Sequence, residues 1–449
     1  MATRKLKIGL LGCGTVGGGL VELVRRNLSL IRQRAGVELS ISKILVRDPL
    51  KERPDAVDRN LLTTQPEKVI NNGCDMVVEL VGGIEPARGF IERSLARGKH
   101  VVTANKALLA IDGFSLMKAA EIQKVRLGFE ASVCGGIPII RALRNGLVGN
   151  QIHSLTGILN GTSNYILTRM AEDRVEFDAA LAEAQVKGFA EADPTLDVDG
   201  HDAAQKLKIL AELAFNTRVS PDAVETAGIR EITSDDMQAA RELGCVIKHV
   251  ATAEAIGDGI ALRVEPVLLP ETHQLAGVRD ENNAVLVHGD AVGDMLFSGK
   301  GAGSLPSASA VLSDIVDIAC HKGGFFSDLG SPLNTVARDS EGKHYLRFPV
   351  ADPSAIGPIT KVLERNGVLV DRAAAIWAKS DGAKSQVRIL TNACQRAALE
   401  KSVGEIAGLE LGSGKSLVMR LWACPPGFPA ADDMPAVRRK TGCAGSPSG

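Results

Sequence analysis

The chain has 449 residues, of which 45% are hydrophobic and 23% are charged, and its formal net charge is -1. This length predicts two to four domains, and the composition is that of a folded globular protein rather than a disordered or collagen-like one. The near-neutral charge disfavours a nucleic-acid partner, because such partners usually require a large basic surface. Aromatic residues make up only 3%, so the core must be built mainly from aliphatic residues, as in parallel α/β sheets.

The eight cysteines are scattered along the chain without any Cys-x-x-Cys pair. This pattern predicts free thiols in a reducing compartment and gives no indication of a zinc site. The first residues run directly into a strand pattern without a secretory signal, and no apolar run reaches the roughly 18 residues of a membrane span. We therefore expect a cytoplasmic protein with no membrane partner.

In the first part of the chain, short apolar strand patterns alternate with helical patterns. This alternation predicts βαβ units and a Rossmann-type parallel sheet, which we assign to residues 1–135. Strands are predicted at Lys7–Leu11, Ile41–Val46, Met76–Val81 and His100–Thr103, and helices at Val16–Arg32 and Ile91–Arg97.

The pattern changes after residue 135. A long helix is predicted at Pro138–Leu147 and a strand at His153–Leu159, and several helices and alternating strands follow. This mixture indicates an α+β substrate domain over residues 136–325. An apolar helix at 309–320 is expected to pack back on the first domain.

The last part begins with a linker, predicted at 326–343 from its glycine, serine and proline content. Residues 344–423 then show a strand-helix-strand-strand-helix-strand pattern, which is typical of a ferredoxin-like fold. Residues 424–449 are rich in proline, glycine, alanine and serine and are predicted to form a disordered tail. The predicted strands of the fold are Tyr345–Val350, Val368–Ala374, Val387–Leu390 and Leu417–Trp422, and its helices are Ile356–Arg365 and Ala397–Ile406.

A Gly-x-Gly-x-x-Gly turn, formed by Gly12, Gly14 and Gly17, joins the first predicted strand to the first helix. The first glycine permits the tight turn, the second lets a pyrophosphate approach the backbone, and the third lets helix and strand pack closely. Its position between strand and helix favours a dinucleotide site over a turn that binds nothing.

The end of the second predicted strand indicates which dinucleotide binds. Arg47 stands where NAD-binding proteins usually place an acid, and Lys51 is near enough to assist it. Since an arginine can pair with a 2′-phosphate, NADP is favoured. Asp48 keeps NAD as an alternative, and a solvated surface charge is the alternative role for Arg47.

Two lysines are the candidates for the chemistry. Lys106 follows a buried strand, at the sheet edge where open α/β folds bind ligands. Lys206 is four residues after Asp202, so both lie on one face of a helix. An exposed salt bridge is the simpler interpretation of this pair, but five carboxylates lie between residues 191 and 206. An acid-rich loop beside such a pair suits a substrate that carries an ammonium group.

Two further segments are candidates for binding. Residues 157–166 end a strand in small polar residues before a helix, which suits either the floor of a polar pocket or a simple capping turn. Residues 130–138 break regular structure between the first two domains. Their glycines could expose carbonyl oxygens to a hard cation, although a hinge is the preferred use on the residues alone.

The run from residue 184 through Gly188, Asp202 and Lys206 resembles the signature of homoserine dehydrogenases. Residues 103–106, 130–138, 157–166 and 301–311 resemble other parts of that family, in the same order along the chain. The resemblance implies reversible NAD(P)H-dependent reduction of L-aspartate 4-semialdehyde to L-homoserine. Two alternatives are another two-domain oxidoreductase of amino-acid metabolism, which should lack the 188–206 run, and an inactive effector-binding scaffold.

The resemblance also implies roles for single residues. Lys206 is the general acid/base, and Lys106 lies beside nicotinamide and substrate. Two lysines close together and partly buried would lower the pKa of Lys206. Glu191 and Asp202 are implied to hold the substrate's ammonium. Implied cofactor contacts are Thr15, Val16, Lys106, Gly188 and Gly303, and implied ligands of a monovalent cation, expected to be Na⁺, are Glu130 and the carbonyls of Val133, Gly135 and Ile137.

The 344–423 pattern resembles an ACT domain, a module that often senses amino acids. The usual Asp-x-Pro-Gly turn is represented by residues 351–354, where Ser354 replaces the glycine. This departure puts threonine binding in question but leaves the fold and a dimerising role as expectations. We expect a homo-oligomer, either a dimer or a tetramer.

Overall fold

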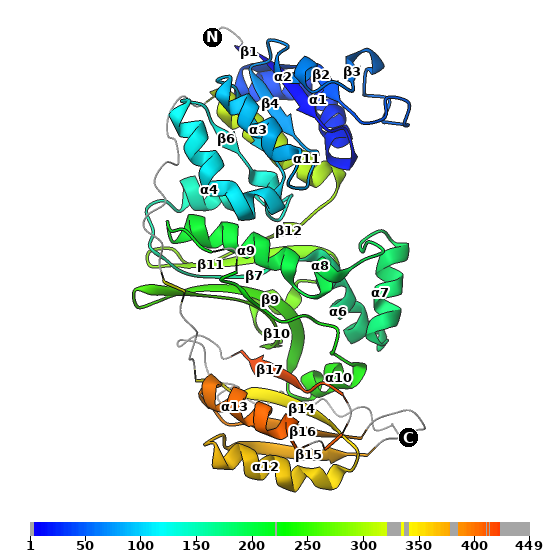
Figure 1. Cartoon of the computed structure of the whole chain (residues 1–449), viewed down its shortest axis with the longest axis vertical. Coiled ribbons are helices and arrows are strands. Elements are labelled where there is room, and N and C mark those ends of the chain that lie inside the picture. Colours follow the sequence, from blue (N-terminus) through cyan, green and yellow to red (C-terminus); the bar gives the residue numbers. More distant parts are fainter. Residues whose placement is uncertain are drawn as a thin grey trace, which may run out of the picture.

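The computed structural model describes residues 4–220, 222–320, 334–335, 341–377, 385–409, 411–412 and 414–422. The predicted tail and most of the predicted linker therefore lie outside the described residues. Three parts are stacked along the long axis of the molecule, in the order of the sequence (Figure 1). In the part of the chain described, no helix is both long and apolar enough to cross a membrane.

The N-terminal part is a parallel sheet with strand order β3-β2-β1-β4-β5-β6. Sequence order reverses between β1 and β4, and in such doubly wound sheets ligands bind beyond the carboxyl ends of the strands at that point. The predicted Rossmann-type sheet is thus confirmed, and the short strands β3 and β6 are additions to the four that were predicted. The strands are β1 (Arg4–Leu11), β2 (Val37–Leu45), β3 (Leu62–Thr63), β4 (Met76–Glu79), β5 (His100–Thr103) and β6 (Leu127–Gly128), and the helices are α1 (Thr15–Ala35), α2 (Glu67–Ile70), α3 (Ala87–Ala96) and α4 (Lys106–Ile122).

Helix α11 (Ser304–Cys320) completes this part from far along the chain. Its apolar face, with Val311 and Ile315, lies in the same core as Leu20 of α1. The two helices approach closely at Gly19, where an added Cβ would stand only 2.4 Å from Ser304 Oγ. The start of α11 is thereby held beside the Gly-rich turn.

The middle part is built on a second sheet, in which β12-β11-β7-β9-β10 are neighbours and pair antiparallel. The predicted helix at 138–147 is irregular: only α5 (Ile139–Arg141) is α-helical, and Ala142–Gly146 is a π-helix. The strands are β7 (Ile152–Ile158), β8 (Glu225–Thr226), β9 (Cys245–Ile256), β10 (Gly259–Pro270), β11 (Asn282–Gly289) and β12 (Gly293–Lys300), and the helices are α6 (Gly161–Asp173), α7 (Phe177–Val186), α8 (Thr195–Val198), α9 (His201–Ala214) and α10 (Ser234–Glu242).

The C-terminal part has the predicted ferredoxin-like topology, with strand order β17-β14-β16-β15. Its edge strand β17 pairs in parallel with β10, so the middle and C-terminal sheets are continuous. A buried ion pair between Arg347 Nε and Asp236 Oδ1, 3.0 Å apart, adds to this junction. The elements are β14 (His344–Val350), α12 (Ile356–Arg365), β15 (Val370–Ile376), β16 (Ser385–Thr391), α13 (Arg396–Ala407) and β17 (Leu417–Leu421), and β13 (Asn334–Thr335) pairs with β10.

Candidate active site

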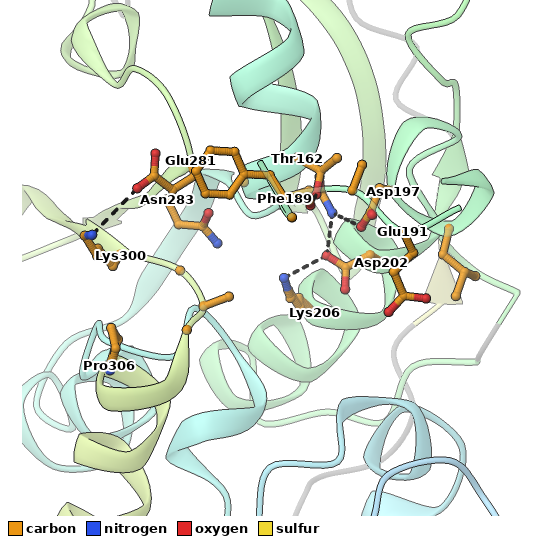
Figure 2. A pocket seen from close by; sticks show the side chains of 18 of the residues that line it. Thr162, Phe189, Glu191, Asp197, Asp202, Lys206, Glu281, Asn283, Lys300 and Pro306 are labelled. Carbon is orange, nitrogen blue, oxygen red and sulfur yellow. Dashed lines mark hydrogen bonds and ion pairs between the residues drawn. The ribbon is translucent and has the colours of Figure 1, made fainter. Parts of the chain in front are cut away.

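A cavity of about 750 Å³ lies where the N-terminal and middle parts meet. The N-terminal part contributes Lys106 and the turn that begins α11. The middle part contributes the start of α6, the loop after α7, and one face of α9 (Figure 2). Lining residues with chemically active side chains are Lys106, Asn160, Thr162, Lys187, Glu191, Asp193, Asp197, Asp202, Lys206, Glu281, Asn283 and Lys300.

The two lysines singled out from the sequence meet at one carboxylate. Lys206 Nζ on α9 donates to Asp202 Oδ2 at 2.7 Å, and Lys106 Nζ lies 3.1 Å from Asp202 Oδ1. Lys106 is brought there because α4 begins at this residue, immediately after β5, and the Asn105 side chain caps the helix by accepting from Leu108 N. The connection from β5 to α4 therefore places the Lys106 ammonium of the N-terminal part against the Asp202 carboxylate of the middle part.

The electrostatics of this group differ from the sequence prediction. Burial alone would lower the pKa of Lys206, but Asp202, with smaller contributions from Cys134 and Asp197, outweighs burial and raises it. The predicted lowering of the Lys206 pKa is therefore wrong, because the carboxylate stands between the two lysines. Burial in turn opposes ionisation of Asp202, yet both ammonium groups hold its pKa at about 2. At neutral pH the group is a carboxylate clamped by ammonium donors.

Two of the three N–H groups of the Lys206 ammonium donate hydrogen bonds within the chain. Besides Asp202 it donates to the backbone carbonyl of Leu159, at 2.7 Å, just past the end of β7. Because an ammonium group has three donors, one N–H has no acceptor among the described residues and is left for a ligand. The Lys206 side chain is only 11% exposed, so the remaining N–H lies on a largely buried part of the cavity lining.

Asn160 and Asp197 extend the polar group. Asn160 caps α6 by accepting from Ser163 N at 2.7 Å, and its amide nitrogen donates to both Asp197 Oδ1 (2.7 Å) and Asp202 Oδ2 (2.8 Å). Burial raises the pKa of Asp197. Sequence reasoning included both residues in longer segments but assigned no role to either. The signal was available for Asn160, since it follows a strand and opens a helix.

Three more of the predicted ligands, Glu191, Gly188 and Gly303, line the cavity. Glu191 is exposed in the loop after α7. Gly188 in that loop and Gly303 before α11 both adopt positive φ, at 76° and 121°. Glycine takes this conformation at little cost, which explains the residue type at both places.

The Gly-rich turn lies outside the cavity lining but is joined to it by Ser304, whose Oγ donates to Thr15 O at 2.9 Å. A Cβ at Gly17 would meet Gly12 O at 2.4 Å, whereas a Cβ at Gly14 would have no neighbour within 4 Å. Gly14 also precedes α1 without a side-chain cap. The first N–H groups of α1 therefore face open space, as an anion requires. Val16 stands in the first turn of α1.

Arg47 lies exposed just beyond β2, on the rim of the N-terminal sheet. A second arginine, which sequence reasoning did not consider, organises the turn that follows. Arg53 donates to the carbonyls of Asp48 and Lys51, each at 2.8 Å. The turn is thus fixed by an arginine that points back into it, while Arg47 faces solvent.

The segment predicted to bind a cation, residues 130–138, does not line the cavity. The Glu130 side chain is buried and accepts the N–H groups of Ile140 (2.9 Å) and Arg141 (2.8 Å) at the start of α5. Burial raises the pKa of Glu130. The Ile137 carbonyl accepts from Ile139 N at 2.8 Å. Each carboxylate oxygen keeps further acceptor capacity, so this segment offers oxygen ligands of the kind that hard cations prefer.

Comparisons with known proteins agree with this architecture. A family profile described as the NAD-binding domain of homoserine dehydrogenase matches residues 12–130, and one described as homoserine dehydrogenase matches residues 138–316. The homoserine dehydrogenase of Bacillus subtilis is 37% identical over 421 residues, which are 91% of this chain and 96% of that protein.

Two solved structures place the fold in the same family. A homoserine dehydrogenase from Thiobacillus denitrificans matches with a TM-score of 0.85 and 40% identity, over 93% of this chain and 98% of that one. A hyperthermophilic archaeal homoserine dehydrogenase in complex with NADPH matches with a TM-score of 0.60 and 27% identity, over 70% of this chain and 98% of that one. The resemblance seen in the sequence is confirmed: the chain is an NAD(P)-dependent oxidoreductase and belongs to the homoserine dehydrogenase family.

Proposed function

We propose that Lys206 is the general acid in the reduction of L-aspartate 4-semialdehyde to L-homoserine. The observation that carries this role is the N–H of its ammonium group that no residue in the described part of the chain accepts, while Leu159 O and Asp202 hold the other two. When bound, the reduced nicotinamide supplies a hydride to the aldehyde carbon. Lys206 gives a proton to the aldehyde oxygen, so the carbonyl becomes an alcohol and the lysine is left neutral. Oxidation of L-homoserine uses the same residue as a base.

In this proposal Lys206 begins the reducing step in its protonated form. A general acid must be protonated before the step, and Asp202 keeps Lys206 so at neutral pH. Lys106, on the other Asp202 oxygen, leaves the group of three with a net positive charge and sits where substrate and nicotinamide meet. Glu191, exposed on the cavity wall, is proposed to accept the substrate's ammonium together with Asp202.

We propose NADP as the preferred cofactor and NAD as the weaker one. The open space at Gly14 and the uncapped start of α1 support a pyrophosphate site there. Arg47 is proposed to pair with the 2′-phosphate, since it is exposed beyond β2 and stands on the same rim of the sheet as the turn. Thr15, Val16, Gly17, Gly188 and Gly303 are proposed as the other contacts.

We propose that a monovalent cation, Na⁺ in the first instance, binds Glu130 and the carbonyls of Val133, Gly135 and Ile137. The chemistry of the donor set supports this, because the ligands are all oxygens and include one buried carboxylate. Glu130 also anchors α5, so a cation there would stiffen the junction between the first two parts of the chain.

We propose that the C-terminal part is an ACT-like module that serves assembly into a dimer or tetramer of a cytoplasmic enzyme. The Asp352 side chain accepts from Ser354 N at 2.9 Å, and a 3₁₀ turn follows at Pro353–Ala355. Because the serine side chain occupies the place of the usual glycine, threonine is proposed to bind weakly or not at all.

The activity is tested by following NADPH oxidation with L-aspartate 4-semialdehyde and with a panel of other aldehydes and ketones. We expect a kcat/KM for the semialdehyde that exceeds all others by at least 100-fold. Preference for an aldehyde without an α-ammonium group would contradict the substrate assignment and favour a different two-domain oxidoreductase. Binding of threonine without any turnover would favour the inactive scaffold.

A further inference from the structure

The carbonyl oxygen of Leu159 is shared by two donors. Lys206 Nζ reaches it at 2.7 Å and the side-chain nitrogen of Asn283 at 2.9 Å. A carbonyl oxygen has two lone pairs, so both are used. Figure 2 shows the amide end of Asn283 and the ammonium end of Lys206 pointing toward one another. The direction in which Leu159 O faces Lys206 is therefore set by Asn283 from the other side.

Asn283 is itself rigidly held. It stands at the start of β11 with 1% of its surface exposed. An added Cβ on Gly301 would lie only 2.1 Å from Asn283 Cγ, so the Gly301 backbone is pressed against the amide. Turning the amide over would bring its oxygen against Leu159 O, and two acceptors would face each other. The donor is thus locked toward the carbonyl.

The other end of the amide has no partner. Asn283 Oδ1 is buried and accepts no hydrogen bond from the residues that the structure describes. A buried unpaired acceptor destabilises the fold. The amide acts on the site through its nitrogen, which donates to Leu159 O and to Cys134 Sγ.

We infer that Asn283 is a positioning residue: by fixing Leu159 O it fixes the direction of the remaining N–H of Lys206. This inference rests on the proposed role of Lys206 as general acid. A misplacement of about 1 Å in a reacting group can cost roughly 10²-fold in rate. Loss of Asn283 therefore slows proton delivery without weakening cofactor binding.

The test is a double-mutant cycle with Asn283→Ala and Lys206→Ala, measured as single turnovers of NADPH with L-aspartate 4-semialdehyde. We expect Asn283→Ala to slow the wild-type enzyme by about 10- to 100-fold, and to slow the Lys206→Ala enzyme by less than about 2-fold, because the lysine through which it acts is gone. An equal loss in both backgrounds, or no loss in the wild type, would overturn the inference.

Three measurements keep the outcome clear. The Kd of NADPH should be unchanged by Asn283→Ala. If Asn283→Ala does not fold, the cycle is measured with Asn283→Asp, which keeps the side-chain shape but removes the amide donor to Leu159 O. Ser298→Ala is the matched control, because Ser298 Oγ donates to the backbone carbonyl of Asn283 at 3.3 Å, and its turnover should stay within about 2-fold. Near-normal turnover of Lys206→Ala alone would instead contradict the role of Lys206.

Discussion

Replacing Asp202 with asparagine removes the charge between the two lysines and keeps the side-chain shape. The pKa of Asp202 is held at about 2 against an ordinary value of 3.8. At 1.36 kcal/mol per pKa unit this difference corresponds to roughly 2 kcal/mol, already net of the burial penalty. The attraction between the carboxylate and the lysines is at least that large, and Lys206 contributes the larger share of it. Loss of the charge should therefore lower the pKa of Lys206 by at least about one unit.

The assay is the pH dependence of L-homoserine oxidation, in which Lys206 must be neutral to accept a proton. In the wild type the rate should rise with pH up to a pKa above the ordinary lysine value of 10.5. In Asp202→Asn the rise should move to lower pH by at least about one unit. A rise that stays in place would refute the electrostatic argument.

Glu212→Gln is the matched control for this prediction. Glu212 pairs with Lys208 at 2.6 Å on the same helix, with the same spacing and both side chains buried, but away from the cavity. Glu212→Gln should lower the stability of the fold without shifting the pH profile of L-homoserine oxidation. The ionised Asp202 stabilises the wild type at neutral pH, and this stabilisation is lost as the pH falls from about 4 to about 2, because the carboxylate becomes protonated. Asp202→Asn should lack this stabilisation at every pH.

Four further outcomes are expected. Arg47→Ala should raise the KM for NADPH at least about 10-fold more than the KM for NADH, and an equal change would rule out a 2′-phosphate contact. Gly14→Ala should keep the Tm and weaken NADPH binding. Gly17→Ala should instead lower the free energy of unfolding by about 1–3 kcal/mol, because its Cβ would clash with Gly12 O. Thermal melts and NADPH titration distinguish the two outcomes. Replacing choline chloride with NaCl should raise the Tm of the wild type but not of Glu130→Gln, and an equal response would contradict the cation site. Threonine should leave the wild-type rate unchanged and inhibit Ser354→Gly; inhibition of the wild type would show a functional effector site.

Local patterns in the sequence predicted most of the fold because they report on local structure. The Gly-rich turn and the periodicity of the C-terminal strands and helices placed those elements within a few residues of their observed bounds. The pairing of β10 with β17 was not predictable, because it joins Val267 to Arg420 across more than 150 residues and leaves no local signal.

The sequence predicted that Asp202 and Lys206 pair on one helix face, but it did not predict the electrostatics of the group. The four-residue spacing of Asp202 and Lys206 revealed their pairing, and the position of Lys106 after a strand revealed that it faces the cavity. The sequence could not show that Lys106 lies on the other oxygen of Asp202, which is why the direction of the Lys206 pKa was wrong. Asn283 was missed because only the folded chain brings it to Leu159 O.

The central claim is that Lys206 supplies the proton, and its most direct test is the turnover of Lys206→Ala with NADPH and L-aspartate 4-semialdehyde. A positioned general acid is worth about 10²–10⁴-fold. The variant should lose kcat by that factor while its Kd for NADPH stays within about 2-fold of the wild type. Turnover close to that of the wild type, with NADPH still bound, would contradict the account.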